Sequence, residues 1–130
     1  MQDAPGPASD NVIDLSVLAT LVGSDPARLH RFLAKFIDST EAGLAELHAC
    51  LARGDLARIR ELGHRIKSAA RVVGALGMGE LCERLERIAP SAGTDGLADA
   101  EALAARLGPM LDHVRAVAAP LDPNAGPGAP

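Results

Sequence analysis

Apolar residues recur at the spacing of an α-helix through four long segments of this chain. The first segment starts at Ser24, Asp25 and Pro26, where a capping side chain precedes a proline at the first helical position, and it stops at Gly54. Its apolar side chains repeat every three or four residues: Leu29, Phe32, Leu33, Phe36, Ile37, Leu44, Leu47 and Leu51. This pattern predicts a long amphipathic helix with one face in a core.

The other three long segments follow the same pattern. Asp55 caps a helix that runs to Val73, an amphipathic segment spans Met78 to Ile88, and the last helix runs from about Thr94 to Ala118. The apolar register continues across Pro109, which favours one kinked helix there over two separate helices. A short helix, capped by Asp14 and ending near Gly23, precedes these four. The prediction is an all-α fold: an antiparallel four-helix bundle with a short additional N-terminal helix.

Composition and length agree with a single helical domain. With 130 residues, 48% of them hydrophobic, the chain can fill one core. It has two Phe, no Trp and no Tyr, whereas strands favour aromatic and β-branched residues. We expect a flexible segment over residues 1–11, the bundle over 12–119, and a disordered tail rich in Pro and Gly over 120–130.

Charge and hydropathy argue against several classes of partner. The net charge of −4 and the lack of stacking aromatics make nucleic acid or an anionic membrane an unexpected partner. The start of the chain lacks the features of a signal peptide, and no apolar run is long enough to span a bilayer. Cys50 and Cys82 fit two buried thiols better than a disulfide or a metal pair. These features predict a cytoplasmic protein.

One histidine lies away from the predicted core. On the helix from Asp55 to Val73, His64 projects nearly opposite the apolar arc, and Lys67, Ser68 and Arg71 follow on the same outer face. An exposed imidazole is partly unprotonated at neutral pH and can attack an activated phosphoryl group. Lys67, whose ammonium we expect to lie in solvent, could offset the phosphoryl charge. Ser68 is small enough to let a partner close over His64, and its hydroxyl could donate a hydrogen bond.

The same helix carries a local excess of positive charge. Six basic residues stand against only Asp55 and Glu61, and they are Arg53, Arg58, Arg60, Arg65, Lys67 and Arg71. Such a basic patch attracts phosphate or an acidic partner surface. An ordinary solvated helix face explains the charges equally well.

These residues carry a family resemblance. The run GHRIKSAARVVGALGMGELCERLE resembles the signature of histidine-containing phosphotransfer (HPt) domains, which has a lysine three positions after a histidine and then small residues and a glycine-bounded turn. The upstream run SDPARLHRFLAKFIDST is similar to the preceding helix of that family. The resemblance covers roughly Ile13 to Ala118. Many members have Gly where this chain has Ser68, a mild departure because serine is also small.

The resemblance implies a phosphorelay intermediate. It implies that His64 accepts a phosphoryl group from the aspartate of one receiver domain and passes it to another, with Lys67 as charge partner. Ser68, Arg71, Arg60 and Arg65 are the expected binding residues around it. The implied partners are response-regulator receiver domains and a hybrid histidine kinase. We expect a monomer without a cofactor of its own, because Mg²⁺ would come from the receiver.

Other interpretations remain as alternatives. A helical adaptor of the same fold could dock on a receiver or kinase without being phosphorylated, but the presence of both His64 and Lys67 disfavours it, because a pure adaptor would not need both. The chain lacks a Walker-type or kinase-type phosphate loop, so we predict no ATP site and no enzyme, and the histidine domain of a kinase fits poorly. Glu61 and His64 have the spacing of a di-iron ligand pair, but the single copy points outward, so we expect no metal. The remaining histidines fit boundary or surface positions: His30, His48 and His113.

Overall fold

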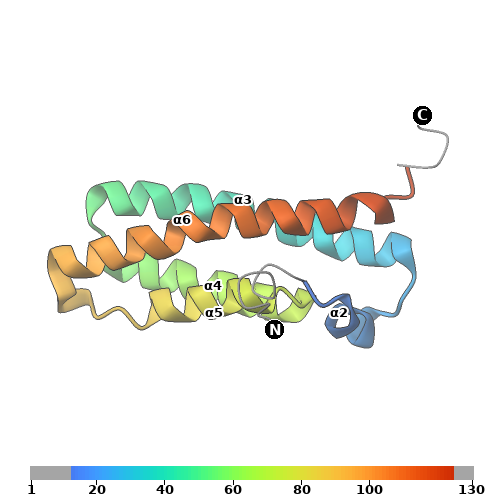
Figure 1. The fold of residues 1–130 in the computed structure, drawn as a ribbon, viewed down its shortest axis with the longest axis horizontal. Helices are drawn as coiled ribbons and strands as arrows, with labels where there is room; N and C mark the ends of the chain where they lie inside the picture. Colours follow the sequence, from blue (N-terminus) through green and yellow to red (C-terminus); the bar gives the residue numbers. More distant parts are fainter. Residues whose placement is uncertain (1–12, 125–130) are drawn as a thin grey trace, which may run out of the picture.

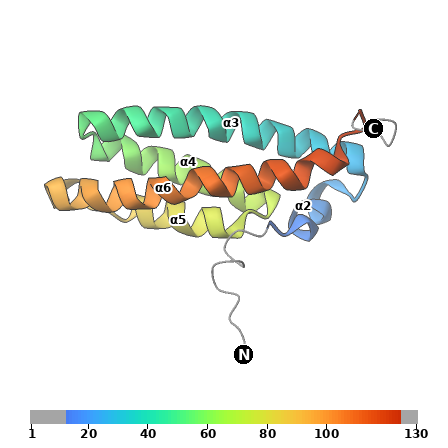
Figure 2. The same ribbon diagram turned by 45° about the horizontal axis from the view of Figure 1, so that its top comes forward.

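Helices account for most of the part of the chain that the computed structural model describes, residues 13–124. They are α2 (Leu15–Val22), α3 (Pro26–Arg53), α4 (Leu56–Val73), α5 (Leu76–Glu86) and α6 (Gly93–Ala118), with the 3₁₀ turns η1 (Pro90–Ala92) and η2 (Ala119–Leu121). The four long helices run antiparallel to their neighbours, and α2 covers one end of the bundle (Figures 1 and 2). α3 and α5 each pack against both α4 and α6. The predicted all-α bundle is confirmed, and no strand occurs within residues 13–124.

Side-chain and glycine caps set the helix boundaries. The Asp14 carboxylate accepts from Ser16 N at 3.0 Å. Asp25 and Asp55 cap α3 and α4 in the same way, each accepting from a backbone N–H at 3.1 Å. At the other ends, Gly54 and Gly74 adopt left-handed φ angles of 71° and 86°. The four boundaries that the sequence predicted most strongly are therefore correct to within a residue or two.

The apolar stripes meet in one core. Its fully buried members come from all five helices and include Leu18, Leu33, Leu47, Ile59, Leu62, Leu85 and Leu107. Cys50 and Cys82 are buried free thiols, as predicted, and burial raises the pKa of Cys82 to about 12. Phe32 departs from the predicted stripe and is 41% exposed. It precedes Leu33 by one position, so it is rotated roughly 100° from that buried side chain.

The two ends of the folded region differ from one another. α6 continues through Pro109, which confirms one helix there, with Leu107, Met110 and Leu111 buried on either side of the exposed proline. Pro120 and Leu121 were expected in a disordered tail, but they belong to η2, where Leu121 packs against the core. The expected flexible segment over 1–11 and the rest of the tail beyond 124 lie outside the described residues.

None of the helices within residues 13–124 has the length and apolarity needed to cross a bilayer.

Candidate functional site

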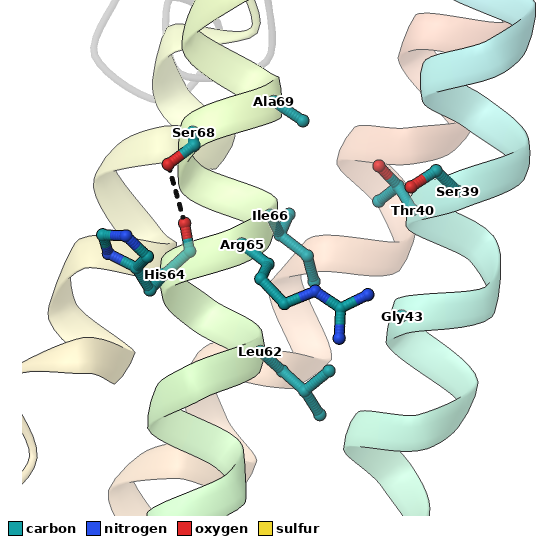
Figure 3. A pocket seen from close by; sticks show the side chains of 9 residues that line it. All are labelled: Ser39, Thr40, Gly43, Leu62, His64, Arg65, Ile66, Ser68 and Ala69. Carbon is teal, nitrogen blue, oxygen red and sulfur yellow. Dashed lines mark hydrogen bonds between the residues drawn. The ribbon is translucent and has the colours of Figure 1, made fainter.

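His64 lies on the solvent side of α4, between buried positions of the same helix. Its side chain is 59% exposed, whereas Leu62, Gly63 and Ile66 are buried. The outward orientation predicted from the helical periodicity is confirmed (Figure 3). His64 is therefore open to a partner and takes no part in core packing.

Gly63 brings α5 close to this histidine. A Cβ atom at Gly63 would lie 3.0 Å from the Cys82 carbonyl oxygen and 3.2 Å from the Leu85 Cβ. Both distances are tighter than ordinary van der Waals contact, so the missing side chain permits the close packing of α4 on α5. This packing brings Glu86, the last residue of α5, beside His64.

The Glu86 carboxylate bridges the two residues of the predicted phosphoryl site. Its Oε2 lies 2.8 Å from His64 Nδ1, and its Oε1 accepts a hydrogen bond from Lys67 Nζ. The hydrogen bond from Lys67, followed by the one from His64, lowers the pKa of Glu86 below that of an ordinary glutamate. Glu86 is thus an ionised carboxylate at neutral pH, shared between an imidazole and an ammonium.

This contact fixes the tautomer of a neutral His64. An ionised carboxylate has no proton to donate, so the Nδ1 atom must carry the proton in the 2.8 Å contact. The lone pair of the neutral ring then lies on Nε2, the nitrogen away from Glu86. The arrangement gives His64 an oriented nucleophilic nitrogen, and the carboxylate can stabilise positive charge that develops on the ring during attack.

Lys67 differs from its predicted environment. Its side chain is only 15% exposed, and its ammonium is held by Glu86 instead of standing free in solvent. The alkyl stem of lysine can pack against apolar surface while its charged end finds a partner. Lys67 is therefore part of the packing between α4 and α5 as well as a neighbour of His64.

The remaining predicted site residues are distributed around His64 with different partners. Ser68 is exposed, and its hydroxyl donates to the His64 carbonyl oxygen at 3.1 Å, so it serves its own helix. Arg60 donates to the Glu86 carbonyl oxygen at 2.9 Å, which supports the end of α5. Arg71 pairs with Glu83 at 2.5 Å, and Arg65 extends toward α3 (Figure 3). The structure thus groups Arg60 with the candidate site and holds Arg71 on a separate ion pair.

Two surface hollows lie on either side of His64. A groove of about 340 Å³ separates α4 from α3 and is lined by Ser39, Thr40, Gly43, Leu62, His64, Arg65, Ile66, Ser68 and Ala69 (Figure 3). A second hollow of about 550 Å³ opens on the other side and is lined by Ala57, Arg58, Arg60, Glu61, His64, Arg65 and Glu86. A partner surface can therefore surround the imidazole.

The other three histidines have different environments. His48 is exposed, and His30 and His113 are half-buried, as expected of surface and boundary positions. His30 lies 4.0 Å from Asp122, and within residues 13–124 neither His48 nor His113 contacts a carboxylate. Glu61, the other half of the weak metal motif, pairs with Arg58 at 2.9 Å and not with His64. Only at His64 do the described residues combine exposure, a carboxylate on Nδ1 and a lysine one turn away.

The described residues thus form an antiparallel helical bundle with an exposed, carboxylate-oriented histidine beside a lysine, and a histidine can act as a nucleophile that forms a covalent intermediate. The family model of the Hpt domain matches residues 31–117, more than half of the chain. The chain belongs to the Hpt domain family, whose members are phosphocarriers that interact with receiver domains in phosphorelays, and this assignment confirms the resemblance noted in the sequence.

The chain is also similar to part of a curated protein. The chain is 29% identical over 90 residues to multistep phosphorelay regulator 1 of Schizosaccharomyces pombe. The match covers 66% of this chain and 30% of the relative, so the chain spans less than a third of that protein. No solved structure matches the chain. The name of this relative agrees with the assignment of the chain to the Hpt domain family.

Proposed function

We propose that His64 is the residue that accepts a phosphoryl group from the aspartyl phosphate of a receiver domain and returns it to the aspartate of another receiver. The observation that carries this proposal is the 2.8 Å contact between His64 Nδ1 and the Glu86 carboxylate, which leaves Nε2 as the exposed nucleophile. The hollows on both sides of the ring give a receiver access to it. The chain then acts as a carrier without an ATP site of its own.

The proposed transfer is a displacement at phosphorus. The Nε2 lone pair forms the N–P bond while the P–O bond of the aspartyl phosphate breaks, and the aspartate leaves as a carboxylate. The proton stays on Nδ1, where Glu86 stabilises the positive charge on the ring. Return of the phosphoryl group to a second receiver reverses these steps. Mg²⁺ would belong to the receiver, since phosphoryl oxygens and aspartates are its usual ligands.

To test the proposal, the purified chain is incubated with a panel of receiver domains that carry a labelled phosphoryl group on their aspartates. We expect the label to move to the chain from at least one receiver and to be labile in acid and stable in base, as a phosphoramidate is. A chain that binds a receiver but never acquires label would support the adaptor alternative and would contradict the proposal.

Glu86 should orient the histidine, which makes its removal a test of the site geometry. Glu86→Ala is expected to lower the transfer rate roughly tenfold or more, because a hydrogen bond to a charged group contributes about 1.5–3 kcal/mol. It should also lower the fraction of His64 with its proton on Nδ1, measured by nitrogen-15 NMR. Glu83→Ala is the matched control, since Glu83 is also an ion-paired glutamate of α5 but bonds Arg71 and Arg87 instead. Equal rates and equal tautomer fractions in both variants would count against the role of Glu86.

Lys67 should matter for transfer as well as for packing. Lys67→Met keeps the alkyl stem but removes the ammonium beside Glu86, and we expect transfer to fall roughly 10- to 100-fold, again from a charge-assisted contact of about 1.5–3 kcal/mol. Lys35→Met, at an exposed position of α3, is the control and should transfer at the parental rate. The comparison uses initial rates from one phosphorylated receiver. Parental transfer by Lys67→Met would show that this lysine serves packing alone.

A further inference from the structure

Thr40 is a buried polar residue whose hydroxyl has no partner among residues 13–124. The residue is 2% exposed, and its side chain forms no hydrogen bond within residues 13–124. Other hydroxyls on the helices bond the preceding turn, for example Thr20 to the Ser16 carbonyl oxygen at 2.7 Å. Burying a hydroxyl without a hydrogen bond is unfavourable, so this group requires a partner other than the described residues, such as water or a bound ligand.

The Thr40 hydroxyl borders the groove between α3 and α4. Ser39 and Thr40 lie on the α3 wall, and the guanidinium of Arg65 extends toward that wall from α4 (Figure 3). The remaining lining is largely apolar and includes Gly43, Leu62, Ile66 and Ala69. The hydroxyl of Ser68 also lines the groove but donates to the His64 carbonyl oxygen, so the groove offers the hydroxyls of Ser39 and Thr40 and one guanidinium above an apolar floor.

Arg65 forms no ion pair within the described residues. Glu46 on α3 is held by Arg58 at 2.7 Å, and the pKa of Glu46 is lowered most by the hydrogen bond from Arg58 and less by the charge of Arg65. A guanidinium and hydroxyl groups together are donors for a carboxylate. An apolar floor suits the methylene groups of an aspartate or glutamate side chain.

We propose that this groove receives one carboxylate side chain of the receiver domain that exchanges phosphate with His64, and that Thr40 and Arg65 thereby select the receiver. The proposal rests on the proposed function of His64. We assign the groove to the receiver because His64, the residue that the receiver must reach, is one of the residues that line it. A receiver surface that reaches the imidazole must cover the groove and close it from solvent, which strengthens the bonds formed inside it.

The test replaces the Thr40 hydroxyl by a methyl group of similar shape. With a receiver that labels the unmodified chain, Thr40→Val should weaken binding about tenfold, which corresponds to about 1.4 kcal/mol. Its melting temperature should stay equal or rise, because the variant no longer buries an unpaired hydroxyl. Phosphoramidate, a small donor that releases ammonia, should label Thr40→Val at the parental rate. Thr94→Val, at an exposed position of α6, is the matched control and should bind normally.

The carboxylate is identified by double-mutant cycles. Each exposed Asp or Glu near the receiver active site is changed to its amide. The binding free energy of each receiver variant is then measured with the unmodified chain, with Thr40→Val and with Arg65→Gln. One acid should show an interaction energy with both Thr40 and Arg65. Normal receiver binding by Thr40→Val, or no coupled acid, would overturn the groove proposal while leaving the role of His64 intact. A saturable shift of the Thr40 and Gly43 amide signals with sodium acetate would assign the groove to a free anion and also overturn it. Failure of every receiver to label the unmodified chain would remove the proposed function, and this proposal with it.

Discussion

Replacing Gly74 by alanine is expected to destabilise the fold by about 3 kcal/mol or more. Gly74 has a φ of 86°, and a Cβ there would lie 2.0 Å from the Asp14 carbonyl oxygen. Left-handed backbone costs about 1–2 kcal/mol for alanine, and overpacking of a tight contact adds about 1–3 kcal/mol. The segment before α2 would have to move away, which breaks the 2.9 Å hydrogen bond from Asp14 N to the Gly74 carbonyl oxygen. Denaturation in urea measures the loss.

Gly54→Ala separates the two causes. Gly54 also has a left-handed backbone, with a φ of 71° and a ψ of 26°, but a Cβ there would lie 3.4 Å from the Leu97 Cδ1 atom, an ordinary van der Waals distance. Its variant should lose only the backbone component, about 1–2 kcal/mol. If Gly74→Ala lost no more stability than Gly54→Ala, the close contact with Asp14 would not hold α2 on the bundle. A larger loss in Gly74→Ala would measure the added cost of displacing the Asp14 carbonyl group.

Helix boundaries were predictable because local residues determine them. The carboxylates of Asp25 and Asp55 accept hydrogen bonds from backbone N–H groups in the first turns of α3 and α4, and Pro26 is the first residue of α3. Gly54 ends α3 with a left-handed backbone conformation. All of these contacts lie within a few residues. The exposed position of His64 was predictable for the same reason, since a 3.6-residue period places it opposite the apolar stripe of α4. Phe32 shows the limit of the helical periodicity, because an apolar residue at the edge of the stripe can be either buried or exposed.

Glu86 was not predicted as part of the site. It contacts His64 from 22 positions away, and the contact depends on how closely α5 packs on α4 at Gly63. The apolar pattern of α4 or of α5 alone does not determine how closely the two helices pack. The expectation of a solvated Lys67 was wrong for the same reason, since the partner that covers it comes from another helix.

The position of Thr40 could have been recognised from the sequence. It stands four residues after Phe36 and four before Leu44, so it occupies a core position in the apolar stripe of α3. A polar residue at such a position indicates either a buried hydrogen bond or a site. The partner on the other wall, Arg65, depends on the packing of α3 against α4 and could not be read from the stripe alone.

The most direct test of the account is to locate the phosphoryl group on the chain. Two variants are compared after exposure to the same phosphorylated receiver: His64→Ala, and a variant in which His30, His48 and His113 are all changed to glutamine. Intact-mass spectrometry under alkaline conditions measures the added phosphoryl group, and thermal melting confirms that both variants are folded. We predict full labelling of the triple variant and none of His64→Ala. Label on folded His64→Ala, or its loss from the triple variant alone, would contradict the assignment of His64 as the phosphoryl carrier.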